Sequence, residues 1–399
     1  MKILVLTNKL PFPPRDGGSI ATLNMLTGLT DAGNQVTCMS LNTLKHNFPV
    51  KEIPTALSER IRFLAIDCDS SIKPLRLLIN LLFSSEPYIA ERFNRQDFRK
   101  RLEVLLMQEA FDLVQLEGPY PGHYLDTIRA GCKAKVSLRA HNVEHLIWKR
   151  KATREKSRLK KWYLANMASR VECFEMKVVG HCDCLVTISP LDLAYFVGQG
   201  SKLPAITIPT GLSMEAYPQT AIPADTSLFF IGALDWLPNQ EGLKWFLENV
   251  FSSLCEAVPG IRFHVAGRNA PRSVMRLLQD KKIIYHGEVE DAREFMKAHR
   301  VMIAPLLTGS GIRIKIIEAM ALGRPVVTTP VGIEGIPAES GREVLVSDKP
   351  EVFKDQVLTL LTDDIKARTL VEAGRTLIQE KFDTFGISAR LSRFFNEQV

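Results

Sequence analysis

A loop of small residues followed by alternating apolar and basic residues is the part of the sequence best suited to chemistry. The loop 308–311 reads Thr-Gly-Ser-Gly, between a buried strand predicted at Val301–Pro305 and a helix predicted at Ile312–Leu322. Backbone N–H groups at the start of a helix lack intrahelical partners, so such a loop favours a phosphate or diphosphate. Arg313 and Lys315 fall in the first turn, where cations are unfavourable unless an anion is present. The pattern predicts an anion-binding site.

Glu318 lies one turn further along the same predicted helix. Because Lys315 and Glu318 are three residues apart, they share one edge of the helix. From that edge a carboxylate could reach past the phosphates and accept two hydroxyl hydrogen bonds, as from a ribose. An ordinary surface pair of Lys315 and Glu318 explains the same spacing, and both interpretations stay open here.

In the first half of the chain, His141 is the main candidate for contact with a substrate. It follows a strand predicted at Lys135–Leu138, and ligands of open α/β sheets bind at the carboxyl ends of the strands. Its neutral ring could form a hydrogen bond with a substrate hydroxyl; a structural histidine is the alternative. Arg139, Asn142 and Glu144 flank it and are weaker candidates for contact with a second substrate.

Strands and helices alternate along most of the chain, which predicts parallel α/β sheets. Strands at Ile3–Thr7 and Gln35–Leu41 enclose a Pro/Gly-rich loop at Pro11–Gly18 and a helix at Ala21–Ala32, which together form a βαβ unit. The alternation restarts with a strand predicted at Leu228–Ile231 and a helix predicted at Gly242–Cys255. We expect two doubly wound, Rossmann-like domains facing a cleft. The expected boundaries are a first domain at 1–205, a linker at 206–227, a second domain at 228–382 and a C-terminal helix at 383–399 that packs back on the first domain.

Length, composition and cysteine content exclude several classes of protein. The 399 residues exceed what one hydrophobic core usually organises, and 46% hydrophobic with 24% charged residues is ordinary globular composition. The longest apolar run, at 77–83, is far shorter than the roughly 20 residues that span a membrane. No signal peptide is visible, so we expect a cytoplasmic protein. Seven cysteines without a zinc-type spacing predict reduced thiols and no metal site.

The formal net charge of +7 calls for an anionic partner. Lys and Arg are densest between 149 and 161, flanked by Trp148, Trp162 and Tyr163. This stretch could contact an anionic membrane surface as a peripheral protein does, or meet a phosphate-bearing substrate; a solvated charged face is the plainer alternative. Nucleic acid is not expected, because no recognisable nucleic-acid-binding module accompanies the charge.

Two other nucleotide-binding classes lack their motifs in this sequence. No Gly-x-Gly-x-x-Gly follows the strand Ile3–Thr7, which argues against a dinucleotide oxidoreductase. No Gly-rich loop ends in Gly-Lys-Ser/Thr, which argues against a P-loop NTPase.

The run 311–329, Gly-Ile-Arg-Ile-Lys-Ile-Ile-Glu-Ala-Met-Ala-Leu-Gly-Arg-Pro-Val-Val-Thr-Thr, resembles the donor-site signature of the family-4 retaining glycosyltransferases. The resemblance covers nearly the whole chain: it includes Pro11–Gly18, Arg139–Glu144, the Ile-Pro-Thr-Gly run at 208–211 and the loop 230–239. It implies a two-domain GT-B fold. It also implies transfer of a sugar from a nucleoside-diphosphate donor to a glycan, lipid-linked or small-molecule acceptor with retention, as in bacterial polysaccharide assembly.

The resemblance also implies roles for individual residues. Glu318 would bind the donor ribose, and Arg313 and Lys315 would neutralise the diphosphate. Gly17 and Gly18 would let the first domain's backbone approach the same phosphates. The donor loop would be formed by Gly309, Ser310 and Gly311. Neither a cofactor nor a metal is implied.

Two departures from the family's pattern keep alternatives open. The family's second glutamate, eight positions before the ribose-binding one, is replaced by Ser310. The common Arg and Lys of the first loop of the second domain are missing after Gly232, so we expect Arg313 and Lys315 to supply that charge. A sugar-nucleotide epimerase on the same fold and a non-catalytic nucleotide-sugar-binding protein are the alternatives.

Overall fold

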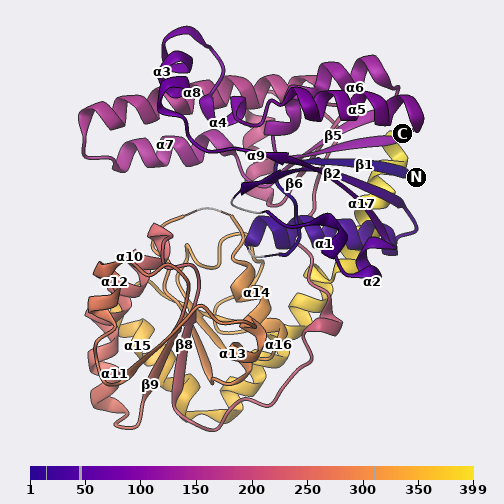
Figure 1. The fold of residues 1–399 in the computed structure, drawn as a ribbon. Helices are drawn as coiled ribbons and strands as arrows, with labels where there is room; N and C mark the ends of the chain where they lie inside the picture. Colours follow the sequence, from indigo (N-terminus) through magenta and orange to yellow (C-terminus); the bar gives the residue numbers. More distant parts are fainter. Residues whose placement is uncertain (15, 45–46, 310) are drawn as a thin grey trace. The chain divides into compact units, whose positions relative to one another are not determined.

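The computed structural model describes residues 1–14, 16–44, 47–309 and 311–399, so Ser310 of the predicted donor loop lies outside the described residues. The chain forms two compact units (Figure 1). The first unit comprises Met1–Gly211 and Thr384–Val399, and the second comprises Leu212–Asp383.

The first unit is built on a seven-stranded parallel sheet in the order β3-β2-β1-β4-β5-β6-β7. The order reverses between β1 and β4, which makes the sheet doubly wound and places its ligand-binding switch point beside these two strands. Residues 3–7 of β1 and all of β4 are buried, as expected for strands covered on both faces. The strands are β1 (Lys2–Thr7), β2 (Gln35–Thr43), β3 (Ile61–Cys68), β4 (Leu113–Glu117), β5 (Lys135–Ala140), β6 (Cys184–Thr187) and β7 (Ala205–Thr207).

Helices cover both faces of this sheet, and each face has its own apolar core (Figure 1). One core includes α5 and α6, and the other includes α1 and the C-terminal helix α17. The helices of this unit are α1 (Gly17–Asp31), α2 (Thr55–Ser58), α3 (Pro74–Phe83), α4 (Tyr88–Glu91), α5 (Gln96–Gln108), α6 (Leu125–Gly131), α7 (Glu144–Arg154), α8 (Arg158–His181), α9 (Pro190–Gly198) and α17 (Thr384–Gln398), with 3₁₀ turns at Val50–Glu52 and Tyr120–Tyr124.

Helix α17 packs closely against α1. A side chain at Gly28 would place its Cβ 1.9 Å from Ser388 Oγ, so glycine is needed for this approach. Leu391 and Phe395 of α17 join Leu26 and Leu29 of α1 in the same core. The last 16 residues therefore belong to the first unit although the second unit precedes them in the chain.

The second unit has a six-stranded parallel sheet in the order β10-β9-β8-β11-β12-β13, again with a reversal next to its first strand. Its strands are β8 (Ser227–Ile231), β9 (Arg262–Ala266), β10 (Ile283–Gly287), β11 (Val301–Ala304), β12 (Val326–Thr328) and β13 (Leu345–Val346). Its helices are α10 (Leu237–Phe246), α11 (Ser252–Ala257), α12 (Arg272–Leu277), α13 (Ala292–Lys297), α14 (Ile314–Ala321), α15 (Pro350–Thr362) and α16 (Asp364–Phe382), with a 3₁₀ turn at Met214–Ala216. The prediction of two doubly wound Rossmann-like units is confirmed.

Two predicted helices differ from the structure, one in its start and one in its continuity. The helix predicted at Ala21 begins at Gly17, because the Asp16 carboxylate accepts a hydrogen bond from Ser19 N at 2.9 Å and caps it. Gly17 and Gly18 are therefore helical. The helix predicted at 242–255 is interrupted by a π-helical segment at Leu247–Phe251.

The segment 206–227, expected to be a linker, is divided between the two units. Residues 206–211 belong to the first unit, where Ile208 is buried. Residues 212–227 belong to the second, where Leu212 and Tyr217 are buried. Its Pro, Thr and Ala content suggested a solvated connection, and the buried apolar side chains among them anchor it instead.

Candidate active site

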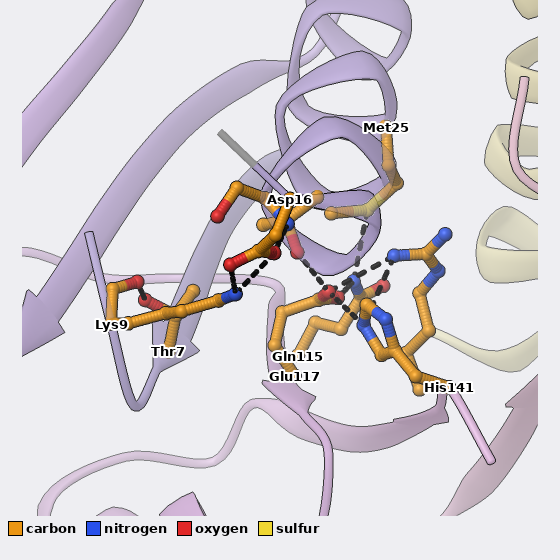
Figure 2. A network of polar contacts seen from close by, with 10 residues as sticks. Thr7, Lys9, Asp16, Met25, Gln115, Glu117 and His141 are labelled. Atoms are coloured by element: carbon orange, nitrogen blue, oxygen red, sulfur yellow. Dashed lines mark hydrogen bonds and ion pairs between the residues drawn. The ribbon is translucent and has the colours of Figure 1, made fainter. Parts of the chain in front are cut away.

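A buried carboxylate organises the carboxyl edge of the first sheet (Figure 2). Glu117 ends β4, and its neighbour in the β5 register is Arg139. Arg139 Nη1 donates to Glu117 Oε2 at 3.0 Å, and Thr22 of α1 donates to the same oxygen at 3.0 Å. Gln115 Nε2 donates to the other oxygen at 2.5 Å. His141 Nε2 completes the set at 2.7 Å from Oε2.

Glu117 is ionised over the whole physiological range. Burial alone would raise the pKa of its carboxyl, but the charge of Arg139 and the contact with His141 outweigh burial and lower the pKa to about 2. The carboxylate is therefore an acceptor only. Arg139 has a side chain that is 1% exposed and forms this ion pair, so it supports Glu117; its predicted contact with an acceptor stays a prediction.

The ionised carboxylate fixes the tautomer of His141. Because Glu117 can only accept, the hydrogen lies on His141 Nε2, and Nδ1 of the neutral ring is an acceptor. The 3.4 Å contact between Arg139 Nη1 and His141 Nε2 joins two donors and is not a hydrogen bond. His141 directly follows β5 and is 20% exposed on its side chain, so its ring can meet a ligand. A neutral His141 would accept a hydrogen bond from a hydroxyl group.

The first turn of α1 follows β1 at the same edge (Figure 2). Lys9 Nζ lies 2.6 and 2.8 Å from the two oxygens of Asp16, the residue that caps α1. The N–H groups of Gly17 and Gly18 occupy the turn in which a helix has no carbonyl partners. A Cβ on Gly18 would lie 3.4 Å from Asp16 Oδ1 and from Lys9 Nζ, so the side-chain-free backbone leaves this turn open.

Glu144 begins α7 and has an unusual titration. Burial and the charge of Glu175 raise the pKa of Glu144 to about 7, although Tyr120 donates a hydrogen bond to it at 3.1 Å. Glu175 in turn accepts from the backbone N–H of Glu144 at 2.9 Å and lies 2.6 Å from His145 Nδ1. Glu144 can therefore exchange a proton near neutral pH. Asn142, which directly follows His141 in the chain, is partly exposed.

In the second unit the predicted donor loop follows β11. Gly309 and Gly311 have φ of +115° and +83°, the left-handed region that favours glycine. A Cβ at Gly309 would lie 3.0 Å from Arg313 Nη2 and 3.3 Å from Trp236. The Arg313 guanidinium lies 5.7 Å from the centre of the Trp236 ring and donates to the carbonyl oxygen of Gly311. Gly309 and Gly311 thus lie beside a buried cation.

Lys315 is the second cation near the start of α14. Its partners are Asn239 of α10 and Phe230 of β8. Its Nζ donates to Asn239 Oδ1 at 3.0 Å and lies 4.3 Å from the centre of the Phe230 ring. A Cβ at Gly232 would lie 2.7 Å from Asn239 Nδ2 and 3.1 Å from Lys315 Nζ, so glycine makes room for the pair. Burial and the charge of Arg313 lower the pKa of Lys315 to about 7. An anion beside the two cations would restore the charged form.

Glu318 is held by a different partner. Tyr217 donates from its hydroxyl to Glu318 Oε1 at 2.6 Å, and burial raises the pKa of Glu318. Burial and the Glu318 carboxylate also raise the pKa of Tyr217, so the phenol stays protonated and remains a donor. The other carboxylate oxygen can accept from a ligand hydroxyl. Lys315 and Glu318 thus have separate partners and are not the surface pair considered as the alternative.

Comparisons with known proteins bear on the domain in the second unit and on the fold. Residues 225–363 match the family model described as glycosyl transferases group 1. In structure the chain is similar to sucrose-phosphate synthase from Thermosynechococcus elongatus, with a TM-score of 0.74 and 17% identity over 100% of this chain and 99% of that one. It is also similar to Anabaena HepE in complex with UDP, with a TM-score of 0.68 and 13% identity over the whole of both chains. Residues 225–363 thus match a group 1 glycosyltransferase domain, and the chain has a GT-B fold.

A curated relative extends the likeness to sequence. The chain is 23% identical over 394 residues to a 44.6 kDa protein in the cps region of Klebsiella pneumoniae, over 96% of this chain and 97% of that protein. The matched segment includes the donor-loop residues and the side chains of Arg313, Lys315 and Glu318. It also includes Trp236 and Asn239, which contact Arg313 and Lys315. Tyr217 precedes the matched segment.

Sequence reasoning missed the residues that hold the predicted ones. Glu117 and Gln115 end an apolar strand, and their alternation with buried leucines is a signal that could have found them. Lys9 stands next to the predicted Pro/Gly loop, and its role depends on the cap at Asp16. Tyr217 lies 101 residues from Glu318, and no spacing in the sequence connects them.

Proposed function

We propose that the protein transfers a glycosyl group from a nucleoside-diphosphate sugar to a glycan or lipid-linked acceptor, with retention at the anomeric carbon. The observation that carries the proposal is the pair of cations at the start of α14, Arg313 and Lys315, followed by the Tyr217-anchored carboxylate of Glu318 within the group 1 domain. A helix start with two adjacent cations is suited to a diphosphate, and the carboxylate one turn later is suited to a ribose. The UDP complex of HepE is in line with this choice of ligand.

Stabilisation of the leaving diphosphate would be the main catalytic contribution. The negative charge grows on the diphosphate as the bond to the sugar breaks, and preorganised cations lower the barrier to that step. Arg313 and Lys315 are held by Trp236 and Asn239 before any ligand arrives, so little reorganisation is needed. These cations supply the charge that a metal would otherwise provide, and the proposal includes no metal or other cofactor in the reaction.

The first unit would contribute polar groups for the sugars. His141 Nδ1 would accept a hydrogen bond from a sugar hydroxyl, because its Nε2 is committed to Glu117. Gly17 and Gly18 would present the first turn of α1 to phosphate. Glu144, whose pKa is near neutral, and Asn142 are candidates for acceptor contact. The cps-region relative supports a glycan acceptor of the polysaccharide-assembly kind.

A panel of UDP- and GDP-sugars tests the proposal. Nucleotide release would be measured with and without acceptor, and the sugar recovered would be checked for inversion at each carbon. Acceptor-dependent release of nucleotide is the expected result. An epimerised sugar nucleotide would indicate the epimerase alternative, and binding without release would indicate a non-catalytic protein. Replacing Arg313 and Lys315 with Ala should abolish donor binding, whereas Lys244→Ala, an exposed lysine of the same unit, should not change it.

We further propose that the first unit rests on an anionic membrane surface through α3 and the start of α8. Among the described residues, no helix is long and apolar enough to cross a membrane. Helix α3 nevertheless turns its apolar side outward: Leu75, Leu78, Ile79 and Leu82 are exposed, Leu82 by 64%, while the polar Asn80 is buried. Residues at i, i+3, i+4 and i+7 form one stripe along a helix, so these leucines and the isoleucine share a face.

Helix α3 is hydrogen-bonded to α8, which lies beside it in Figure 1. Arg170 of α8 donates to the carbonyl oxygens of Asn80 and Leu81 at 3.0 and 2.9 Å. Asn80 Nδ2 donates to the carbonyl oxygen of Glu86 at 3.0 Å. These bonds orient the outward face as a fixed feature of the unit. A patch of exposed apolar side chains whose position is fixed indicates a surface that contacts a partner.

Charge indicates which surface this is. Residues 149–161 contain eight Lys or Arg and one Glu, a net charge of +7 that equals the formal charge of the whole chain. At the start of α8, Leu159 and Trp162 are exposed among Lys160 and Lys161. Basic residues near an anionic leaflet contribute about 1 kcal/mol each, and exposed aromatic and aliphatic side chains enter the headgroup region. An anionic lipid surface matches both features.

Co-sedimentation with vesicles tests this contact. The protein should bind vesicles of phosphatidylglycerol and phosphatidylethanolamine and lose binding to neutral phosphatidylcholine vesicles or in high salt. Leu78→Ser with Leu82→Ser should reduce binding, and Ile365→Ser, at a still more exposed residue of the second unit, should not. Undiminished binding of the double variant would refute the proposal. A dimer that the double variant converts to monomer would show instead that a second copy covers this face.

A further inference from the structure

Three histidines meet on the second unit, outside the residues assigned to the reaction. His264 lies in β9, His286 lies in β10, and His299 lies between α13 and β11. One imidazole nitrogen of each lies within 4.8 Å of the other two. Among the residues that the structure describes, this is the one group of three His, Cys, Asp or Glu side chains close enough to hold a metal ion.

The distances are close to those of a metal site. His264 Nδ1 lies 3.0 Å from His286 Nε2, and the rings of His264 and His299 stack with centres 3.9 Å apart. Tetrahedral zinc binds histidine nitrogen at 2.0–2.1 Å, which separates two ligand nitrogens by roughly 3.3 Å. The third nitrogen, that of His299, lies within 4.8 Å of the other two and would have to move closer to bind the same ion.

One nearby carboxylate favours a cation at the three histidines. A neutral imidazole offers the lone pair of one ring nitrogen to a metal ion. Asp225 is near enough for its negative charge to act on His264 and His299, although Arg262 opposes it at His264. His286 is exposed and His299 is buried, so a metal could enter from solvent and be held against the sheet.

We propose that His264, His286 and His299 bind a divalent transition-metal ion of the zinc class, with the fourth coordination position open to solvent. None of these residues belongs to the donor loop, to α14 or to their partners at the end of β8. The site is therefore distinct from the reaction site, in which no metal is expected. Three histidines are the ligand set that suits Zn²⁺, Co²⁺ and Ni²⁺ among divalent ions.

A plainer explanation is a packed histidine cluster. Two neutral imidazoles can share one hydrogen bond between His264 Nδ1 and His286 Nε2, and His299 can stack on His264 and pack against Phe295 without any ion. The two explanations differ in a measurable property. A packed cluster does not bind metal stoichiometrically, and its stability does not rise with metal concentration.

Calorimetric titration of the untagged, chelator-treated protein with Zn²⁺ alone tests the proposal, with Co²⁺ absorption as a report of coordination. We expect one equivalent to bind, a four-coordinate Co²⁺ spectrum, and a thermal midpoint that rises with Zn²⁺ concentration. His286→Ala should weaken binding by about 100-fold or more, since loss of a mere supporting group already costs 10–100-fold. Because His286 is exposed, this variant should fold.

The matched control is His181→Ala, an exposed histidine of the first unit. It should bind Zn²⁺ as the unaltered protein does. Absence of stoichiometric binding would overturn the proposal. Binding that survives His286→Ala, or that is lost equally in His181→Ala, would also overturn it, because the ion would then be held elsewhere.

Discussion

Lys315 should make donor binding depend on pH. Its ammonium group is buried beside Arg313, and the pKa lies near 7 in the absence of an anion. A diphosphate placed against it would favour the charged form and return the pKa toward its ordinary value. Binding would then take up a proton whenever the solution pH exceeds 7.

The size of the effect follows from the pKa. A group with a pKa of about 7 is half charged at pH 7 and about 1% charged at pH 9, so affinity should fall about 50-fold between these values. Proton uptake on binding should approach about one proton at pH 8. The phosphates of a sugar nucleotide do not titrate in this range, so they do not cause the pH dependence of the affinity. Groups of the protein do. Removing the charge with Lys315→Met should weaken binding at pH 7 by about 1.5–3 kcal/mol.

Calorimetry in buffers of different ionisation enthalpy measures both affinity and proton uptake. The unaltered protein should show the loss of affinity from pH 7 to pH 9, and Lys315→Met should show weak, pH-independent binding. Lys315→Arg keeps a charge that does not titrate here, so its affinity should also be independent of pH. Lys244→Met serves as the control and should behave as the unaltered protein. If the donor affinity of Lys315→Met still fell strongly from pH 7 to pH 9, the titrating group would not be Lys315.

Three further predictions concern other parts of the structure. Glu318→Ala should lower nucleotide affinity by about 1.5–3 kcal/mol and remove the preference for a ribonucleotide over its 2′,3′-dideoxy analogue; a preference that persists would contradict the ribose contact. The pKa of Glu117 is lowered on folding, so its stabilising effect is present above the unfolded pKa near 4.3 and declines as pH falls toward 2. Denaturant unfolding should therefore lose about 2 kcal/mol between pH 5 and pH 3 through this group, and Glu117→Gln, which leaves Arg139 unpaired, should be less stable at pH 7 and lack that dependence. Gly28→Val should displace α17 by a clash with Ser388 and lower the thermal midpoint. Gly180→Val, in a helix where an added Cβ meets no atom within 4 Å, is the control and should lack that clash.

The sequence predicted the fold because the alternation of apolar strands and helices is a local signal. Boundaries were predicted less well where one side chain decides them. Asp16 moves the start of α1 to Gly17, and a π-helical segment at Leu247–Phe251 interrupts a helix whose apolar pattern looks continuous. The segment 206–227 has the composition of a linker, yet Ile208 and Tyr217 anchor its two ends in different units.

For the candidate site, motif spacing located the residues but not their environment. Arg313, Lys315 and Glu318 stand together in one run, so the sequence placed them on one helix. Their partners come from segments far along the chain: Asn239 is 76 residues from Lys315, and Tyr217 is 101 residues from Glu318. Only the fold brings these pairs together, and burial then sets their pKa values.

Acceptor-dependent release of nucleotide from a panel of sugar nucleotides is the most direct test of glycosyl transfer. We expect release with at least one UDP- or GDP-sugar, a product that keeps the donor's anomeric configuration, and loss of both in the variant lacking Arg313 and Lys315. A protein that binds these donors and releases no nucleotide with any glycan or lipid-linked acceptor, or that returns an epimerised sugar nucleotide, would contradict it.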